Sequence, residues 1–291
     1  MKRPRILVTG AQGQVGHALA QLLPPHGEVI ALDRAVLDLA NPDAIVAAVR
    51  AAAPDLIVNA GAYTAVDAAE HDRAAAFAVN AEAPQVLAEE ARRLGALLIH
   101  YSTDYVFDGM ARMPYAEDAP VAPLNVYGES KLAGEEAIAS SGAHALTLRT
   151  SWVYGLRGRN FLLTIRRLAA QRPELRIVAD QSGTPNWAVA LAQATATLVA
   201  QGLPALKDRA GLYHFSATGN TTWFGFAQAI VGAAASPVVV PITTAAFPTP
   251  ARRPAYGVLA TSRFTSTFGF ALPAWEQSLA DCLADDRQRG E

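Results

Sequence analysis

The stretch that decides the fold is residues 8–16, VTGAQGQVG. It follows the apolar run RILV, which is typical of a buried strand, and it leads into QVGHALAQLL, which favours a helix. Glycines at 10, 13 and 16 in this context match the dinucleotide-binding fingerprint. A glycine-rich turn without a ligand is the alternative, because glycine motifs alone are a weak signal. The strand before the glycines and the helix after them favour cofactor binding.

Each glycine has its own physical role in this fingerprint. Gly10 permits the tight turn, Gly13 lets the backbone approach a pyrophosphate, and Gly16 allows the helix to pack closely on the sheet. The negative phosphates then face the free N–H groups at the helix N-terminus. The sequence therefore predicts that a dinucleotide binds where this helix begins.

Outward from the glycines, short β-rich runs alternate with helical stretches rich in Ala and Leu. Asn41 and Pro42 are typical of the N-cap and first turn of a helix. The expected strands are residues 5–10, 28–33, 55–61 and 96–104, and the expected helices between them follow the glycines, residue 41 and residue 72. This βαβαβαβ order predicts a parallel sheet with helices on both faces.

The second half of the chain is less regular. A helix is expected from Val126 to about Ser140, followed by one strand over residues 144–155. Further helical stretches are expected near 160–171, 187–200 and 223–235, with a proline-rich loop at 247–257. The predicted fold class is α/β: a Rossmann-type doubly wound parallel sheet in residues 1–155, with a smaller C-terminal substrate-binding lobe in 156–291. Some segments of the lobe are expected to return to the first domain.

Composition restricts the partners. The chain has 291 residues, a formal net charge of −2 and a pI of about 6.3, so no electrostatic footprint for nucleic acid or an anionic membrane stands out. The apolar stretch 229–242 is broken by Pro237 and Pro241, and we expect core helix, turn and strand there. The single cysteine, Cys282, cannot form an internal disulfide, and no Cys/His cluster has zinc spacing. A cytoplasmic small-molecule enzyme fits best.

The end of the second predicted strand bears on the choice of cofactor. Asp33 lies 20 residues past Gly13, where a carboxylate accepts hydrogen bonds from the adenosine ribose and favours NAD. Arg34 follows at once, and its guanidinium is able to hold a 2′-phosphate instead. Asp38 and Leu39 are candidates for contact with the adenine, although an ordinary loop acid before a helix cap is the alternative. The sequence leaves both NADPH and NADH open.

The segment YGESK places Tyr127 and Lys131 four residues apart, on one face of a helix. A tyrosine pKa near 10 is too high for easy proton exchange at neutral pH, and a nearby ammonium lowers it. Such a pair is able to protonate a carbonyl oxygen as hydride arrives at its carbon. An exposed helical pair is the alternative, but the glycine fingerprint upstream favours a catalytic pair.

Thr103 ends the fourth predicted strand, in STDYVFDG at 102–109. Ligands of doubly wound sheets bind beyond the carboxyl ends of the strands. The Thr103 hydroxyl is therefore a candidate donor to the same carbonyl oxygen that Tyr127 protonates. A strand-end threonine with only a structural role is the alternative.

Eight segments, in order along the chain, carry a resemblance to a known family: TGAQGQVG, PDLIVNAGAYTAVDAAE, HYSTDYVFDG, PLNVYGESKLAGEE, RTSWVYG, DQSGTP, GLYHFSATGNTTW and PTPARRP. In these segments the chain resembles the extended short-chain dehydrogenase/reductase superfamily and, within it, the dTDP-4-dehydrorhamnose reductase family. The resemblance implies reduction of the 4-keto group of dTDP-6-deoxy-L-lyxo-4-hexulose with hydride from NADPH or NADH.

The resemblance also implies roles for particular residues. Tyr127 is the expected proton donor, Lys131 its partner and Thr103 the group that polarises the carbonyl. Asp104 and Trp152 are expected to contact the sugar, and Arg253 the nucleotide diphosphate. The residues expected to line the cofactor are Gly13, Gln14, Val15, Asp33, Asp38, Leu39, Ala62, Tyr63, Thr64 and Tyr101.

Some positions depart from the family pattern. Asn186 replaces a small hydroxyl residue, and Tyr256 and Gly257 stand where Asn and Ser are common. Some relatives dimerise through a magnesium ion held by acidic residues, one of them on the helix after the glycines. Because that helix carries no carboxylate here, we expect no metal, and a monomer or weak homodimer.

Two other functions stay open at the sequence level. A nucleotide-sugar 4-epimerase with tightly bound NAD uses the same glycines, tyrosine and lysine. A non-catalytic regulatory subunit, like that of methionine adenosyltransferase, is the non-enzymatic alternative. Three further residues receive structural interpretations: His100 as a core histidine, and Glu135 with Glu136 as a solvated helix face.

Overall fold

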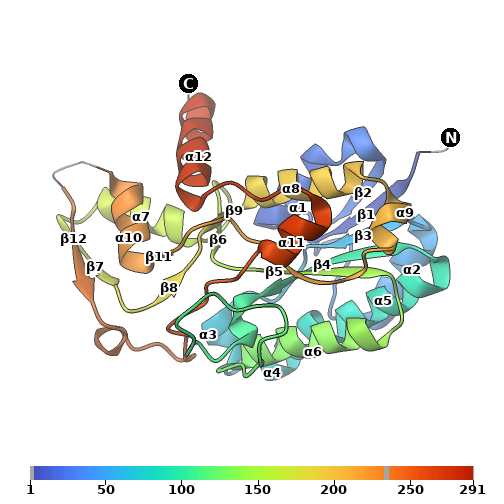
Figure 1. The fold of residues 1–291 in the computed structure, drawn as a ribbon, viewed down its shortest axis with the longest axis horizontal. Coiled ribbons are helices and arrows are strands. Elements are labelled where there is room, and N and C mark those ends of the chain that lie inside the picture. Colours follow the sequence, from blue (N-terminus) through green and yellow to red (C-terminus); the bar gives the residue numbers. More distant parts are fainter. Residues whose placement is uncertain (1–2, 233–235, 291) are drawn as a thin grey trace.

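A six-stranded parallel sheet forms the centre of the protein in the computed structural model, which describes residues 3–232 and 236–290 (Figure 1). Its strands lie in the order β10-β5-β4-β3-β1-β2. Their bounds are β1 (Arg5–Thr9), β2 (Glu28–Leu32), β3 (Leu56–Asn59), β4 (Leu97–Thr103), β5 (Ala145–Thr150) and β10 (Gly211–His214). The four strands predicted before residue 105 are confirmed, and so is the α/β doubly wound architecture.

Both faces of the sheet are buried, which explains the continuous apolar runs of the strands. Ile6 and Val8 of β1 pack into one hydrophobic core with α1 and α8, while Leu7 between them packs into a second core with α2 and α5. The same alternation holds along β3 and β4. Successive residues of these strands therefore face opposite layers of helices. The same alternation determines which layer each polar residue near the carboxyl ends of the strands faces.

Helices cover the sheet on both sides (Figure 1). On one side α1 and α8 pack on each other, and on the other side α2, α5 and α6 form a second layer. The bounds of the helices before residue 141 are α1 (Gln14–Leu22), η1 (Pro24–His26), α2 (Pro42–Ala52), α3 (Val66–Ala69), α4 (Arg73–Phe77), η2 (Ala78–Glu82), α5 (Ala83–Leu94), η3 (Asp104–Val106) and α6 (Val126–Ser140).

Local capping explains where two of these helices begin. Asn41 caps α2 as predicted, since its side chain accepts a hydrogen bond from Ala44 N and Pro42 occupies the first turn. Asn125 caps α6 in the same way, with Gly128 N as the donor at 2.8 Å. The start of α6 is thus fixed two residues before Tyr127.

The long helix expected after residue 72 is interrupted. It forms as α4 and α5 with the π-helical turn η2 between them. Asn80 lies in this turn, and its side chain bonds both backbone polar groups of Tyr63. A π-turn of this kind often accompanies a functional site, and here it places a buried amide beside the loop after β3.

The strand expected over residues 144–155 is also interrupted. It forms as β5 and the short β6 (Val153–Tyr154), because Trp152 between them has a φ of 42° that no strand residue adopts. The helices expected near 160–171 and 187–200 are confirmed as α7 (Phe161–Ala169) and α8 (Ala188–Ala200).

Several elements of the second half of the chain pack against the elements of the first half. β10 adds the sixth strand beside β5, and α8 packs on α1. The other elements after residue 170 are β7 (Glu174–Val178), β8 (Ser182–Gly183), β9 (Asn186–Trp187), α9 (Leu203–Lys207), β11 (Thr221–Thr222), α10 (Trp223–Val231), β12 (Val238–Ile242), η4 (Thr244–Ala246), α11 (Ser262–Phe268) and α12 (Trp275–Gly290).

A separate hydrophobic cluster holds the smaller lobe together. It contains Leu162, Leu175, Phe226 and Cys282, from α7, β7, α10 and α12. The helix expected over 223–235 ends at Val231, and residues 233–235 of that expectation lie outside the described part of the chain. The strand expected after the turn is confirmed as β12, which pairs with β7. Residues 247–257 form the expected loop, apart from isolated bridges.

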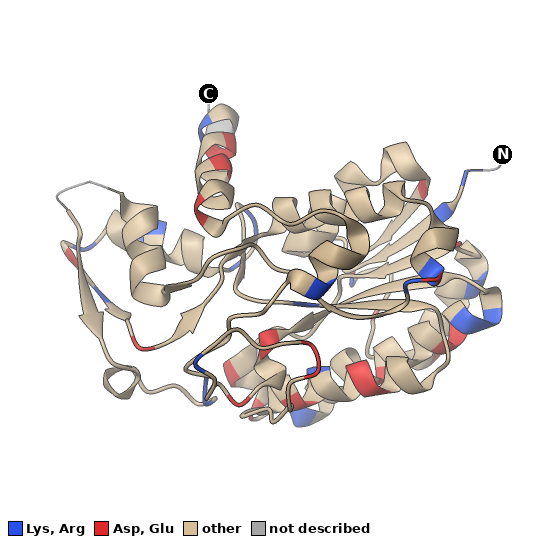
Figure 2. Ribbon diagram, in the orientation of Figure 1, with Lys and Arg blue, Asp and Glu red and all other residues tan. Residues whose placement is uncertain are grey.

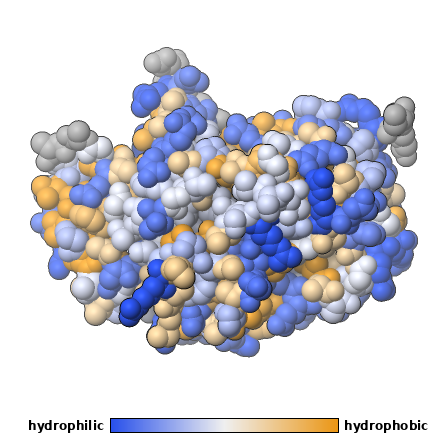
Figure 3. Space-filling view, in the orientation of Figure 1, coloured by the Kyte–Doolittle hydropathy of each residue, from blue (hydrophilic) through white to orange (hydrophobic). Residues whose placement is uncertain are grey.

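The surface shows no dominant charge. Acidic and basic residues are interspersed along the ribbon (Figure 2), and the face drawn in Figure 3 mixes hydrophilic and hydrophobic residues. Within residues 3–232 and 236–290, none of the helices has both the length and the apolar character needed to cross a membrane. In the same residues, no three or more His, Cys, Asp and Glu side chains group in a way that suits a metal ion.

Candidate active site

The glycine-rich turn after β1 is closely packed. Gly10 has a φ of 67°, and a Cβ added to it would lie 2.6 Å from backbone atoms of Gly61. A Cβ on Gly16 would lie 2.2 Å from Gly10 O. Side chains at these two positions are therefore excluded by the left-handed turn and by the approach of α1 to it.

The N-terminus of α1 suits an anionic ligand. Its N-cap is Gly13, which is exposed and offers no side-chain cap to the first-turn N–H groups. Gln14 turns aside and accepts a hydrogen bond from Asn160 at 2.9 Å, while Val15 packs against the core under α8. Backbone donors at an uncapped helix start, beside a turn that only glycine permits, fit the pyrophosphate of a dinucleotide.

Asp33 lies just past the end of β2, beside this turn. Its carboxylate accepts hydrogen bonds from Gln12 Nε2 at 3.0 Å and from Ala35 N at 2.9 Å. These bonds, led by the one from Gln12, lower the Asp33 pKa, so the group is a carboxylate at neutral pH. Arg34 next to it is exposed. The Asp33 carboxylate, which suits a ribose, and the Arg34 guanidinium, which suits a 2′-phosphate, therefore lie next to each other just after β2.

The next candidate cofactor residues differ in accessibility. Asp38 is exposed and caps its own turn by accepting from Ala40 N at 3.0 Å. Leu39 is buried beside Gly61, where an added Cβ would lie 2.4 Å from Leu39 Cδ1. Leu39 thus packs against Gly61, the glycine that also packs on Gly10.

Ala62, Tyr63 and Thr64 follow β3 at the carboxyl edge of the sheet, and their side chains are half-buried or exposed. Tyr101 of β4 lies apart from them. Its hydroxyl bonds Thr195 of α8 at 2.6 Å, and its ring lies by Phe215. Tyr101 thus faces the α1/α8 side of the sheet, while its carbonyl oxygen is bound by Lys131.

Thr103 and Tyr127 come together at the end of β4. Thr103 is buried, and its hydroxyl donates to Asp104 Oδ1 at 3.1 Å and accepts from Tyr105 N at 3.2 Å. The Thr103 hydroxyl also lowers the pKa of the Tyr127 phenol, so the two side chains lie close to each other. Gly128 makes the approach possible, because a Cβ there would lie 2.3 Å from Tyr105 O.

The pKa shift of Tyr127 has the opposite direction to the expected one. Burial raises its pKa to about 12 and exceeds the lowering effect of Thr103, while the Asp104 carboxyl raises it further. Lys131 is not among the groups that shift this pKa, and its Nζ lies beside His100 and Tyr101 O. Tyr127 is therefore a protonated phenol at neutral pH, which is the form that a proton donor requires.

Lys131 is fully buried on α6. Its Nζ lies 3.2 Å from His100 Nε2 and 2.7 Å from Tyr101 O. Burial lowers its pKa to about 8, although Glu135 on the next turn raises it. Lys131 is thus near its titration point at neutral pH, unlike a surface lysine.

Asp104 is buried beside these groups with one oxygen unused. Its Oδ2 has no hydrogen-bond partner among the described residues, and a Cβ on Gly257 would lie 2.3 Å from it. Burial raises the Asp104 pKa to about 7, against the lowering effect of the bond from Thr103. A buried acid with a free oxygen is suited to accept or donate a hydrogen bond to a ligand hydroxyl.

Asp104→Asn should become more stable relative to the wild type as pH rises from 4 to 8. The folded pKa is raised, so the wild type loses stability as pH rises from the unfolded value of 3.8 through about 7, and the amide has no such loss. The difference should be on the order of 4 kcal/mol, about 1.4 kcal/mol for each of roughly three pKa units, measured by urea unfolding at both pH values.

The matched control is Asp108→Asn. Hydrogen bonds from Met110 N and the Tyr115 hydroxyl lower the Asp108 pKa, so its linkage to pH has the opposite sign. The stabilisation of the wild type by this carboxylate is nearly complete above the unfolded pKa of 3.8, so the stability difference between Asp108→Asn and the wild type should change little from pH 4 to 8. Parallel trends in the two variants would contradict the assignment of Asp104 as a buried, weak acid.

Trp152 is held in a strained conformation. It has a φ of 42°, and its ring stacks on Trp223 of α10 with centroids 3.6 Å apart. A Cβ on Gly183 would lie 2.4 Å from the other side of the ring system. A strained residue clamped between two elements is a common feature of ligand-binding sites, and here it joins β5 to the smaller lobe.

Arg253 lies in the proline-rich loop and pairs with Asp67 of α3. Its two terminal nitrogens lie 2.9 Å from Asp67 Oδ1 and 2.8 Å from Oδ2. Asn125 also donates to the loop, at Arg252 O, 2.7 Å away. The loop is thereby fixed against the start of α6, with the Arg253 guanidinium already carrying a counter-ion.

Several contributors were not identified from the sequence. Asp67 and Gly183 hold two of the candidate substrate residues, and Glu70 accepts from Val126 N at 2.9 Å at the start of α6. Glu135 is buried and bonded to Arg149 at 2.6 Å, so the expectation of a solvated face is wrong for it and right for the exposed Glu136. Glu70 and Asp67 belong to the quoted segment PDLIVNAGAYTAVDAAE, which is the one signal that marked them.

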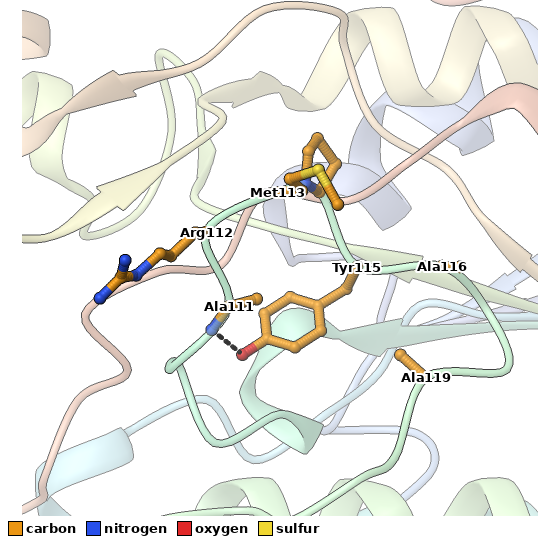
Figure 4. Close-up of a pocket in the computed structure, with 7 residues that line it drawn as sticks. Ala111, Arg112, Met113, Tyr115, Ala116 and Ala119 are labelled. Carbon is orange, nitrogen blue, oxygen red and sulfur yellow. Dashed lines mark hydrogen bonds between the residues drawn. The ribbon is translucent and has the colours of Figure 1, made fainter.

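A surface pocket lies away from these groups, in the loop after β4 (Figure 4). The Tyr115 hydroxyl accepts a hydrogen bond there from Ala111 N at 3.1 Å. Its lining residues are Ala111, Arg112, Met113, Pro114, Tyr115, Ala116 and Ala119. They include none of the candidate catalytic or cofactor residues.

Comparison with known proteins agrees with this geometry. A model of the RmlD substrate binding domain matches residues 4–288. The chain is 49% identical over 296 residues to the dTDP-4-dehydrorhamnose reductase of Burkholderia thailandensis, covering 97% of the chain and 98% of the relative. It is 44% identical over 283 residues to the enzyme of that name from Escherichia coli K12, covering 93% of the chain and 94% of the relative.

A solved structure is similar along its whole length. The crystal structure of dTDP-4-dehydrorhamnose reductase from Bacillus anthracis in complex with NADP superposes with a TM-score of 0.91 at 35% identity. The match covers 98% of this chain and all of that one. The fold and the order of the segments are therefore shared with this group of proteins.

Proposed function

The chain belongs to the RmlD family of dTDP-4-dehydrorhamnose reductases, and from this we propose that it reduces the 4-keto group of dTDP-6-deoxy-L-lyxo-4-hexulose to give dTDP-L-rhamnose. It is an oxidoreductase that acts on a nucleotide-activated keto-sugar and takes its hydride from NADPH or NADH. The observation that carries the proposal is the closeness of the Thr103 hydroxyl to the Tyr127 phenol, at the same carboxyl edge of the sheet as the glycine-rich turn.

The residues present fit a dinucleotide. The glycine turn, the uncapped start of α1 and the Asp33 carboxylate would hold its pyrophosphate and adenosine ribose. When bound, the reduced nicotinamide supplies hydride to the carbonyl carbon. Lys131 is placed to donate to the ribose next to the nicotinamide, because its Nζ lies at the carboxyl end of β4.

The protein supplies the proton and stabilises charge. Tyr127, a protonated phenol, gives its proton to the sugar oxygen as negative charge develops there. Thr103 donates a second hydrogen bond to the same oxygen, after turning from Asp104. Asp104, Trp152 and Arg253 are proposed to orient the substrate, with the free Asp104 Oδ2 as the acceptor for a sugar hydroxyl.

An assay of net cofactor oxidation tests the proposal. Purified protein should oxidise reduced nicotinamide when the dTDP-keto-sugar is added, with loss of absorbance and formation of dTDP-L-rhamnose. Tightly bound NAD that copurifies without net consumption would support a 4-epimerase instead. Stoichiometric cofactor binding without oxidation would support a regulatory subunit.

Asp33→Asn should shift the preference toward NADPH. The Asp33 carboxylate is ionised, so it repels a 2′-phosphate and attracts ribose hydroxyls, while the exposed Arg34 is kept. We expect the ratio of kcat/KM for NADPH to that for NADH to rise about tenfold, the order of one screened charge interaction. An unchanged ratio at low salt would exclude Asp33 from the cofactor site.

The remaining properties follow from composition and contacts. We propose a cytoplasmic enzyme, because its one cysteine, Cys282, is buried in the core of the smaller lobe. We also propose a monomer or weak homodimer without a magnesium bridge, because α1 carries no acidic residue.

A further inference from the structure

A buried row of polar side chains leads from the glycine turn to Lys131. Thr9, Asn59 and His100 are register partners on the neighbouring strands β1, β3 and β4. Each is at most 1% exposed, and all three point to the α6 side of the sheet because they share the parity of Leu7, Ile57 and Leu98. Lys131, also 1% exposed, closes the row from α6.

The hydrogen bonds of the row determine where its protons lie. Asn59 Oδ1 is bonded by Gly61 N at 3.3 Å, and a backbone N–H is only a donor. Thr9 Oγ1 donates to the same oxygen at 2.6 Å. The nitrogen of the Asn59 amide therefore faces His100, and it donates to Nδ1 at 3.0 Å.

This contact selects one form of the His100 ring. Nδ1 must carry a lone pair to accept from Asn59, and a neutral imidazole then carries its hydrogen on Nε2. Burial, followed by the charge of Lys131, holds the His100 pKa well below its usual value, so the ring is neutral. The Nε2–H group points at Lys131 Nζ, 3.2 Å away.

A hydrogen bond from Nε2–H to Nζ requires a lone pair on the lysine nitrogen. The uncharged amine has one, and it still donates to Tyr101 O at 2.7 Å with a further N–H to spare. An ammonium group has no lone pair and would turn an N–H toward another N–H. The row therefore favours the amine.

We infer that His100 is a positioning residue of the proposed reductase: Asn59 locks its neutral ring in the Nε2–H form, and this form donates to Lys131 and stabilises the lysine amine. Lys131 then exchanges between amine and ammonium near neutral pH, rather than remaining a permanent cation. The consequence for turnover rests on the proposed function, whereas the form of the ring does not.

The other charged groups near the pair do not replace this contact. Glu135, one turn along α6, favours the ammonium form of Lys131, but its carboxylate is bound by Arg149 of β5 and by Ser102 of β4. On β5 the register partner of His100 is Thr147, which carries no charge. Tyr101 of β4 offers its carbonyl, and its phenol is turned toward α8. Tyr127 and Asp104 interact with Thr103.

The direct test is a nitrogen NMR spectrum of the full-length protein labelled at histidine, with His100→Gln used to assign the signal among the six histidines. The wild type should show His100 protonated at Nε2 and unprotonated at Nδ1 between pH 6 and 9. A hydrogen on Nδ1 would overturn the inference even if the protein reduces the keto-sugar. Conversely, the protein could give the expected spectrum and show no reductase activity. That result would support the inference about His100 and refute the proposed function.

Variants of Asn59 test whether its amide holds the His100 ring in the Nε2–H form. In Asn59→Leu, His100 is free to move its hydrogen to Nδ1 and accept from the Lys131 ammonium, and Asn59→Asp should enforce the same change through a carboxylate acceptor. Both changes stabilise the ammonium and so raise the Lys131 pKa, and the pH at which kcat changes as Lys131 loses its proton should therefore move upward by about one pH unit. Thr9→Val is the control, because Gly61 N still orients the amide. Two results would contradict this role of Asn59: a pH shift in Thr9→Val as large as that in Asn59→Leu, or no pH shift in either Asn59 variant.

Discussion

Tyr127→Phe should lose most of its turnover, with kcat lower by about 10²- to 10⁴-fold, the range of a lost general acid. The wild-type phenol has a pKa of about 12 and is protonated at neutral pH, so its hydroxyl is a proton source close to Thr103. The ring itself stays in place, since its edge contact with Tyr105, at 5.5 Å between centroids, does not need the hydroxyl. Binding of NADPH should therefore change little, because the missing hydroxyl acts in the transition state.

The matched control is Tyr213→Phe. Tyr213 is a buried residue of β10, and its hydroxyl donates a hydrogen bond to Arg209 O at 2.8 Å. The control should keep nearly full turnover and lose only a little stability. A Tyr127→Phe protein that keeps nearly full kcat, measured from cofactor oxidation at saturating substrate, would show that another group is the acid.

Thr103→Val should reduce kcat by about 10²- to 10³-fold, as for removal of a single oxyanion donor. Valine has the shape of threonine, so the buried end of β4 keeps its packing while the hydroxyl is lost. The variant also removes the hydroxyl that lowers the Tyr127 pKa, which makes the phenol a weaker acid. Both effects act on the same developing oxyanion.

Thr103→Ser separates the hydroxyl from the methyl group. It keeps the donor to Asp104 Oδ1 and the acceptor for Tyr105 N, so it should recover most of the lost rate. Equal rates for the wild type and Thr103→Val, at saturating cofactor and substrate, would return Thr103 to a purely structural role at the strand end.

The sheet was predictable because its signals are local. β1, β3 and β4 each contain three consecutive apolar residues, at 6–8, 56–58 and 97–99, which is the pattern of parallel strands buried on both faces. Asn41 and Pro42 mark the start of α2 by capping chemistry that does not depend on the rest of the fold. The glycine spacing likewise requires only the neighbouring strand and helix.

The interruptions were not predictable, since they depend on distant contacts. The π-turn at Asn80 is held by Tyr63, 17 positions earlier, and the break at Trp152 is held by Gly183 and Trp223. Composition alone favours an uninterrupted helix and an uninterrupted strand there.

The site residues also divide into those that local sequence predicted and those that depend on distant contacts. The spacing of Tyr127 and Lys131 placed both on one helix face, but it did not reveal that Nζ binds His100 and Tyr101. Glu135 looked solvated beside Glu136, because its partner Arg149 belongs to a strand rather than to the helix surface. Pairwise spacing predicts which residues are neighbours, whereas burial and a third partner determine their protonation.

A crystal structure of the complex with NADP and dTDP-L-rhamnose tests the central claim most directly. The 4-oxygen of the sugar should lie about 2.6–3.2 Å from both Tyr127 Oη and Thr103 Oγ1, with the nicotinamide ring facing carbon 4. If both protein oxygens lie beyond the reach of one bridging water from that atom, these residues do not carry the reduction.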